Sequence, residues 1–127
     1  MTLRNAPPES LLANKELYMT PTLLFNTVVL SQVDAAVNQQ SVSVDISEAS
    51  GFAVHAVFTG SPNGQLKIMG SNDASLGFGV IQTQSISSSG SVLLNVQSAH
   101  YTSMRVEYVA TSGSGTLSAR VSGKSLE

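Results

Sequence analysis

Alternation of apolar and polar side chains along most of the chain is the feature that most constrains its fold. Over residues 41–46 the apolar side chains are Val42, Val44 and Ile46, and residues 52–58 repeat the pattern. Successive side chains of a β-strand point to opposite faces, so this period places one face of each strand against a core. No stretch beyond residue 22 carries the apolar stripe of an amphipathic helix. The pattern predicts an all-β protein.

About eight segments of this kind follow one another at intervals of about 10 to 15 residues, joined by turns rich in Gly, Ser and Asn. The segments cover residues 23–30, 41–46, 52–58, 66–70, 77–86, 92–96, 104–110 and 116–121. Residues 60–64 are expected to join two of them into a hairpin, and residues 111–115 form a second turn. Short strands at such regular spacing indicate an antiparallel β-sandwich or jelly roll.

The first 22 residues differ from the rest and predict an extended N-terminal arm. They contain Pro7, Pro8 and Pro21, and consecutive prolines favour extended backbone. The segment is more apolar than a solvated tail needs to be, since it carries Leu3, Leu11, Leu12, Leu17, Tyr18 and Met19. We expect residues 1–22 to be an assembly arm that docks on a neighbouring subunit, with a solvated tail as the alternative. Residues 23–127 are then the β-sandwich domain.

Charge is scarce, which limits the classes of partner. Charged residues make up 11% of the chain, against about 25% in average proteins, and the net charge is −2. This balance argues against the basic patch that nucleic acid or anionic lipid requires, so neither is expected as a partner. No apolar run reaches the roughly 18 residues of a membrane span, and a secretory signal is not expected. Without cysteine the chain has no disulfide, thiolate nucleophile or Cys-ligated metal.

Residues that could carry chemistry occur singly. His55 and His100 are the two histidines, and a metal site would have to add scattered carboxylates to them. His55 lies between apolar neighbours, where a histidine satisfied by a polar neighbour or packed at an interface is favoured over a pH-sensitive ligand. Asp73 follows Asn72, and a self-capping turn is favoured there over one arm of a calcium site. We expect no cofactor, no metal and no enzymatic activity.

Serine supplies most of the polar side chains of the predicted strands. The chain has 21 Ser, and the serines expected to face outward are Ser41, Ser43, Ser85, Ser87, Ser89, Ser91, Ser118 and Ser122. Short side chains lose little entropy on being ordered, and the centres of protein interfaces are depleted in charge. The composition therefore favours assembly with copies of itself or neighbouring proteins over a surface without a partner.

A glycan-binding or host-attachment module is the alternative function. Exposed aromatic side chains commonly line ligand sites, and the chain has no Trp and three Tyr. Tyr101 and Tyr108 are the possible ligand-facing residues of such a site. A glycan partner is therefore a weaker expectation than assembly.

Several motifs in the second half of the chain resemble a known family. In order they are T-G-x-P-x-G at residues 59–64, L-K-I at 66–68, S-N-D at 71–73, Y-x-x-x-R-V-x-Y at 101–108 and T-S-G-S-G-T-L at 111–117. This order resembles small β-sandwich proteins encoded among the structural genes of bacteriophages, over about residues 50–124. In similar sequences the S-N-D motif runs on to a Trp-containing strand, which residues 74–78 replace here.

The resemblance implies a non-enzymatic structural protein located in a phage virion. It implies a capsid-associated role (decoration, vertex or connector) or a tail-associated one. Other copies of itself and neighbouring virion proteins are the partners expected on this basis. Within the motifs, Arg105 and Glu107 share the outward face of one predicted strand, where charge pairs between strands help to set the register.

Overall fold

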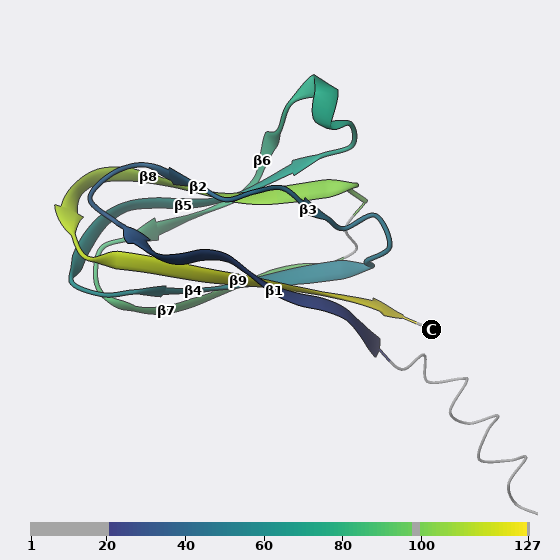
Figure 1. The fold of residues 1–127 in the computed structure, drawn as a ribbon, viewed down its shortest axis with the longest axis horizontal. Coiled ribbons are helices and arrows are strands. Elements are labelled where there is room, and N and C mark those ends of the chain that lie inside the picture. Colours follow the sequence, from purple (N-terminus) through teal and green to yellow (C-terminus); the bar gives the residue numbers. More distant parts are fainter. Residues whose placement is uncertain (1–20, 98–99, 127) are drawn as a thin grey trace, which may run out of the picture.

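Two antiparallel sheets face each other in the computed structural model, which describes residues 21–97 and 100–126 (Figure 1). Sheet A contains, in order, β1 (Pro21–Asp34), β9 (Thr116–Leu126), β4 (Gly51–Phe58) and β7 (Gly90–Val96). Sheet B contains, in order, β2 (Gln39–Gln40), β8 (Ser103–Ser114), β5 (Ser61–Ser71) and β6 (Gly79–Ile86), and β3 (Val44–Asp45) also pairs with β8. The predicted all-β, antiparallel sandwich is confirmed.

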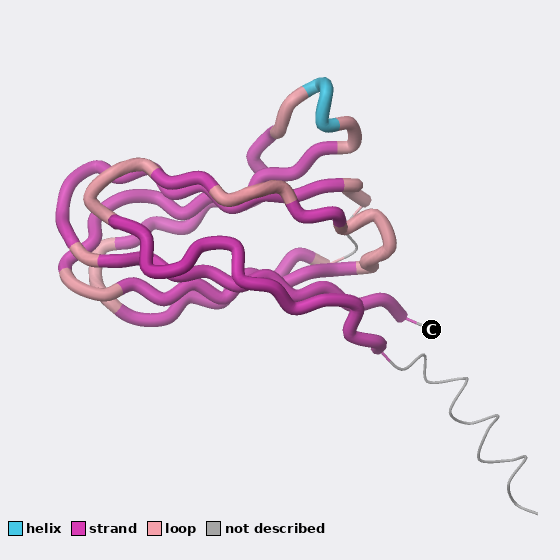
Figure 2. The backbone as a smooth tube through the Cα atoms, in the orientation of Figure 1, coloured by secondary structure: helices cyan, strands magenta, loops and turns pink. Residues whose placement is uncertain are grey.

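Strands account for nearly all of the regular structure (Figure 2). The 3-10 turn η1 (Ala74–Leu76) lies between β5 and β6. None of the helical structure in the described ranges is long and apolar enough to cross a membrane. The first strand begins at Pro21, two residues before the predicted domain boundary at residue 23; residues 1–20 of the predicted arm lie outside the described residues.

The strand order is that of a jelly roll, in which two Greek keys fold onto each other. β2 and β3 act as two halves of one strand, because both pair with β8. Apart from these halves and the β5–β6 pair, consecutive strands always lie in different sheets. Each crossing connection therefore spans the thickness of the sandwich.

Ser41 joins the two halves, and its predicted outward orientation is wrong, as is the core-facing orientation that the alternation assigns to Val42, which is 72% exposed. Ser41 is buried, and its Oγ accepts a hydrogen bond from the Val106 amide at 2.9 Å and donates one to the Val42 carbonyl at 2.8 Å. Its own amide donates to the Val106 carbonyl at 2.8 Å. A buried backbone amide needs a partner, and here a side chain supplies it where the strand is interrupted.

The predicted hairpin over residues 60–64 is also wrong, because β4 belongs to sheet A and β5 to sheet B. Gly60, with φ of 78°, turns the chain from one sheet to the other, and residues 61–64 already belong to β5. Gly115, with φ of 121°, turns β8 into β9 in the same way. A Cβ added at Gly60 would lie 2.7 Å from the Gly115 Cα, so the two corners pack directly on each other.

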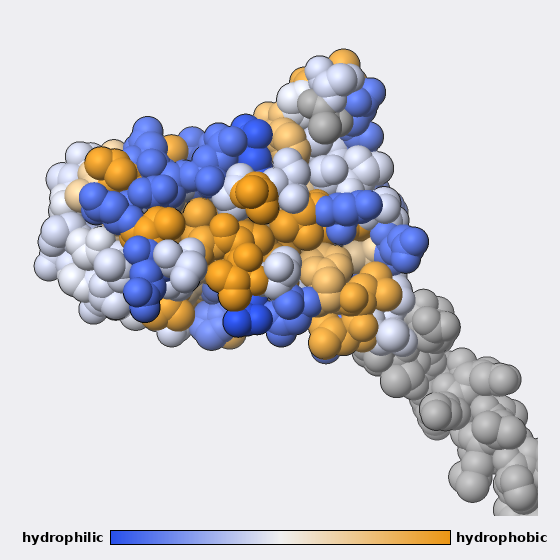
Figure 3. All heavy atoms as spheres, in the orientation of Figure 1, coloured by the Kyte–Doolittle hydropathy of each residue, from blue (hydrophilic) through white to orange (hydrophobic). Residues whose placement is uncertain are grey.

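The core lies between the sheets and is built from alternate residues of each strand. β4 contributes Phe52, Val54, Ala56 and Phe58, β8 contributes Met104, Val106 and Tyr108, and β9 contributes Leu117, Ala119 and Val121. The rings of Phe58 and Tyr108 meet across the two sheets with centroids 5.3 Å apart. Figure 3 shows apolar side chains gathered along the middle of the molecule, between the two layers.

Between β5 and β6 the chain projects from the sandwich as a segment that we call the finger, residues 72–78. It rises from sheet B on the side away from sheet A (Figure 1). Within η1, Leu76 is 83% exposed, and Gly77 follows it with φ of 87°. The finger therefore presents an aliphatic side chain to solvent, outside the core.

Candidate assembly surface

The outer face of sheet A consists of the side chains that alternate with its core residues. They are Leu23, Asn26 and Val28 of β1; Ala53, His55 and Val57 of β4; Ser91, Leu93 and Asn95 of β7; and Ser118, Arg120, Ser122 and Lys124 of β9. Most of these side chains are short, apolar or uncharged. The predicted outward serines on these strands, Ser91, Ser118 and Ser122, therefore lie on this face.

One row of paired residues crosses the middle of this face. Val28 pairs with Arg120, Arg120 with His55, and His55 with Leu93. The two ends of the row are aliphatic, with Leu93 71% exposed and Val28 49% exposed. The Arg120 guanidinium donates to the Asn26 side-chain oxygen at 3.0 Å. His55 is exposed in the middle of this row, on the side of β4 opposite Phe52 and Phe58, as its alternation predicts.

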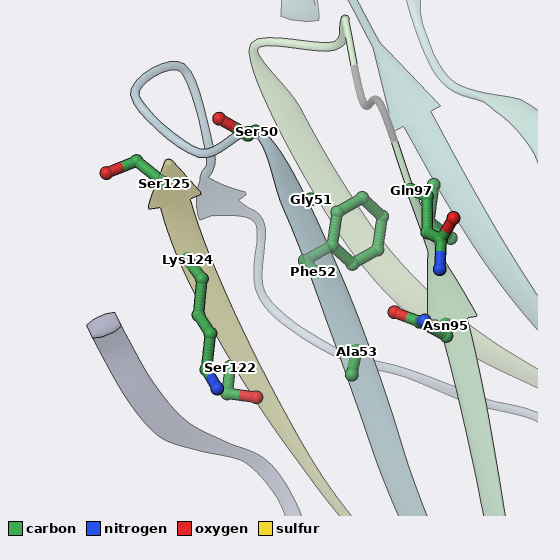
Figure 4. Close-up of a pocket in the computed structure, with 10 residues that line it drawn as sticks. Ser50, Gly51, Phe52, Ala53, Asn95, Gln97, Ser122, Lys124 and Ser125 are labelled. Carbon is green, nitrogen blue, oxygen red and sulfur yellow. The ribbon is translucent and has the colours of Figure 1, made fainter. Parts of the chain in front are cut away.

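A trough of about 570 Å³ hollows the same sheet beside the row (Figure 4). It is lined by Ser50, Gly51, Phe52, Ala53, Asn95, Val96, Gln97, Ser122, Lys124 and Ser125. Ala53 pairs with Ser122 on one side and Asn95 on the other, and Gly51 pairs with Lys124. Gly51, which has no side chain, and Ala53, which has only a methyl group, thus lie beside strands that carry longer side chains. We infer that this difference in side-chain length creates the hollow.

The formal charges on this part of sheet A are both positive, Arg120 and Lys124. The described carboxylates lie elsewhere: Asp34 at the end of β1, Asp45 and Glu48 before β4, Asp73 in the finger, and Glu107 on β8. Glu107 pairs with Arg105 of its own strand at 2.7 Å. Among the residues that the structure describes, the row and the trough therefore have a weak positive character without an internal counter-charge.

Asp73 and Asp45 cap their own turns. The Asp73 carboxylate accepts the Ser75 hydroxyl at 2.8 Å and the Ser75 amide at 3.0 Å, and these bonds hold its pKa below the usual value. The Asp45 carboxylate accepts the Ser47 amide and hydroxyl in the same way, which lowers its pKa too. The predicted self-capping turn at Asp73 is confirmed. Within the described residues, no group of three or more His, Cys, Asp or Glu side chains could hold a metal ion.

The prediction that Tyr108 faces a ligand is wrong. Its side chain is 0% exposed, it packs on Phe58, and burial raises the pKa of its phenol. Tyr108 follows Met104 and Val106 at the spacing of a strand, so the side chain belongs to the core face. Tyr101 is half-buried beside Gly70, and the two tyrosines do not form one exposed platform.

The other predicted site residues lie outside the described ranges. They are the apolar residues of the arm, namely Leu3, Leu11, Leu12, Leu17, Tyr18 and Met19. Sequence reasoning also missed the exposed leucines, Leu76 and Leu93. The signal for Leu93 was present, because three consecutive apolar residues, Val92, Leu93 and Leu94, place one of them on the outer face of a strand.

Comparison with known proteins identifies similarity of fold. No protein-family model matches the chain, and no curated protein sequence matches it. The SPBc2 prophage-derived protein YomS has a similar structure, with a TM-score of 0.56 and 10% identity, covering 82% of this chain and 96% of that one. PirA gives a TM-score of 0.54 and 11% identity, covering 77% of this chain and 91% of PirA.

A virus structure shares the same fold. A chain of the infectious bursal disease virus Gx strain gives a TM-score of 0.51 and 12% identity over 84% of this chain. This chain covers 32% of the viral one, so the similarity concerns one part of a longer protein. These similarities support the β-sandwich architecture. At identities of 10–12% they concern the fold alone.

Proposed function

We propose that the protein is a non-enzymatic structural component of a phage virion, associated with the capsid and assembling with copies of itself and with neighbouring virion proteins. The observation that carries the proposal is the outer face of sheet A, which combines exposed aliphatic side chains, serines and few charges. The motif resemblance and the fold shared with a prophage-derived protein and a virus chain support it. Jelly rolls are common in viral capsids.

Burial of apolar surface is the proposed driving force. Leu93 is 71% exposed, and covering a leucine side chain contributes about 1.5–3 kcal/mol. The serines around it lose little entropy when a partner orders them. This face can therefore form a protein interface without desolvating many charges, which is costly.

The arm is proposed to add a second contact. Its apolar residues, Leu11, Leu12, Leu17, Tyr18 and Met19, would dock on an adjacent subunit. The described chain begins at β1, beside a hollow of about 310 Å³ lined by Leu24, Phe25, Asp45, Ile46, Ser47, Glu48 and Ala49. An arm that leaves the sheet at this point starts from a partly apolar surface.

Copy number in purified particles tests the proposal. Quantitative mass spectrometry is expected to find hundreds of copies per particle for a capsid protein. A few dozen copies would place the protein at vertices, and about six to twelve would place it in the neck or tail, where rings of low symmetry occur. Absence from particles that carry their other structural proteins would contradict the proposal.

Deletion of residues 1–20 tests the arm separately. The truncated protein is expected to lose incorporation into particles while its far-ultraviolet circular dichroism and melting temperature stay those of a folded β-sandwich. The full chain, expressed in the same way, is the control. Incorporation of the truncated protein at wild-type occupancy would show that the arm is not needed.

A further inference from the structure

We infer that the finger of one copy docks into the trough of a second copy, so that molecules associate head to tail. The inference rests on the proposed function, because it names the partner and the polarity of the assembly contact. Four observations support it: the exposed tip of the finger, its rigid attachment, the charge of the trough, and the opposite faces on which finger and trough lie.

The tip of the finger is an apolar group held in a fixed turn. Leu76 is 83% exposed, and its amide donates to the Asp73 carbonyl at 2.9 Å. The Asp73 side chain accepts both polar hydrogens of Ser75, at 2.8 and 3.0 Å. The amide of Asp73 in turn donates to the Ser71 hydroxyl at 3.1 Å. A side chain presented on a preorganised turn loses less entropy on binding than one on a mobile loop.

The base of the finger is fixed to sheet B. The Arg105 guanidinium lies 4.3 Å from the centre of the Phe78 ring, and the Glu107 carboxylate accepts from the same guanidinium at 2.7–2.8 Å. Met69 pairs with Arg105 in the sheet and is 8% exposed although it points outward. The cation–π contact therefore holds the finger against the sheet, and the ion pair with Glu107 keeps the Arg105 guanidinium in place.

The trough offers a complementary site. Its volume of about 570 Å³ falls within the ~300–1,000 Å³ range of pockets that enclose ligands. Ala53 gives its lining an apolar side chain, and Lys124 supplies a positive charge, while the side chains of Phe52 and Val96 belong to the core beneath the trough. Within the described residues, Lys124 forms no ion pair with a carboxylate. The exposed Asp73 carboxylate, three residues from Leu76, is a counter-charge of the right sign.

Finger and trough lie on opposite faces of the sandwich. The finger projects from sheet B away from sheet A, whereas Ala53 and Lys124 lie on the outer face of sheet A (Figure 1, Figure 4). A finger therefore cannot reach the trough of its own chain. Direct pairing of two sheet A faces would bring Arg120 and Lys124 of both copies together, and like charges across an interface are unfavourable. Head-to-tail contact avoids this repulsion and leaves a free finger and a free trough at the two ends.

The contact is expected to be weak when it acts alone. One fingertip buries far less than the ~1,000 Å² typical of a stable protein interface. Many such contacts along an assembly would act together, because each additional contact forms at a high local concentration. Trapping by a covalent cross-link is therefore a better measurement than the elution volume of the free protein.

Pairwise cysteine cross-linking tests the inference, since the chain has no cysteine of its own. Full-length Leu76→Cys is mixed in equal amounts with full-length Ala53→Cys that carries a mass tag, under mild oxidation. A disulfide needs Cα atoms within about 4.4–6.8 Å, so only residues that meet will link efficiently. The mixed dimer is expected to exceed both homodimers by about tenfold. The matched control replaces Ala53→Cys by Val57→Cys, on the same strand but outside the trough.

The other arrangements give different products. Excess Leu76→Cys homodimer would mean that fingers meet, and excess Ala53→Cys homodimer would mean that sheet A faces meet. Equal linking to the Val57→Cys control would mean collision without a specific site. Absence of any cross-link would leave the trough to another occupant, such as residues 1–20. Each of these results overturns the inference.

A second measurement uses substitutions that leave the sandwich intact. Leu76→Ser is expected to weaken self-association by about tenfold or more in sedimentation, since it removes the group that the contact buries. Val42→Ser is the matched control, because Val42 is 72% exposed and lies on neither the finger nor sheet A. Equal association of the two variants would contradict the inference. A protein that cross-links as expected but is absent from particles would support the inference and refute the proposed function. A protein that is present in particles but does not cross-link would refute the inference and leave the proposed function standing.

Discussion

Gly115 shows how a single residue fixes the path of the chain between the sheets. It joins β8 to β9 with φ of 121°, and a Cβ added there would overlap the Thr59 carbonyl. Hydrogen bonds surround this corner: the Gly115 carbonyl accepts the Ala35 amide at 3.0 Å, and the Thr59 and Thr116 hydroxyl oxygens lie 2.7 Å apart. Both the conformation and the space therefore require glycine.

Gly115→Ala is expected to lower the free energy of unfolding by about 2–4 kcal/mol, because backbone strain adds to steric overlap. Gly77→Ala is the matched control, since Gly77 also has positive φ but an added Cβ would meet nothing within 4 Å. That control is expected to lose about 1 kcal/mol from strain alone. Urea unfolding of both variants measures the difference, and equal losses would mean that overlap with Thr59 is unimportant.

Tyr108 predicts an effect of alkaline pH on stability. Burial raises the pKa of its phenol, so the folded protein favours the protonated form more than the unfolded chain does. The stabilisation is complete below the unfolded pKa of about 10 and is lost as pH rises above it toward the folded value. Tyr108→Phe is expected to flatten this decline, as measured by melting temperature between neutral and alkaline pH. An identical alkaline profile for the variant would contradict the prediction.

The same substitution is expected to cost little at neutral pH. The Tyr108 hydroxyl has no hydrogen-bond partner among the described residues, and removing an unsatisfied buried polar group is close to neutral or stabilising. Tyr108 also shows where sequence reasoning failed at this scale. Its spacing from Met104 and Val106 assigned it to the core, whereas the chemistry of tyrosine alone suggested a ligand site.

At the scale of elements, the strands could be predicted and their partners could not. Alternation located the strands because burial of one face imposes a period of two on the sequence. The turn at Gly60 carries the same residues whether the chain forms a hairpin or crosses to the opposite sheet, so the pairing of β4 was not determined locally. The orientation of Ser41 was not determined by its sequence either, since serine is equally suited to a solvent-exposed position and to a buried one where its hydroxyl forms hydrogen bonds.

The finger is an element whose rigidity depends on a contact with the sheet. Phe78→Ala is expected to speed amide hydrogen exchange over residues 72–78, because the ring no longer holds the Arg105 guanidinium at 4.3 Å. Global stability should fall by only about 1 kcal/mol, the size of a partly exposed cation–π contact. Leu76→Ala, at the exposed tip, is the control and should change neither quantity. Unchanged exchange in Phe78→Ala would mean that the turn alone keeps the finger ordered.

For the whole molecule, we propose that stability and assembly depend on opposite sides of the same strands. Leu93 and Leu94 are neighbours in β7, yet Leu93 is 71% exposed and Leu94 is 5% exposed. The low charge content predicted a surface for assembly, but composition could not indicate which sheet has the exposed apolar side chains on which we base the proposed interface. The position of the trough depends on the register that places Gly51 and Ala53 beside Lys124 and Ser122.

Leu93→Ser is expected to change the free energy of unfolding by less than about 0.5 kcal/mol and to reduce incorporation into particles. Leu94→Ser is the matched variant and is expected to lose about 3 kcal/mol or more, because it leaves a cavity and a buried hydroxyl in the core. Thermal unfolding and particle composition measure the two effects. Normal incorporation of Leu93→Ser would exclude this face from the proposed interface.

The connection between β5 and β6 has a consequence for how such a protein can diversify. Most other connections between strands must bridge the two sheets, so their lengths are constrained by the fold. The finger leaves and re-enters a single sheet, and insertions or replacements there need not disturb the jelly roll. Replacement of a few residues at this one place would therefore change the surface that the finger presents and leave folding unchanged.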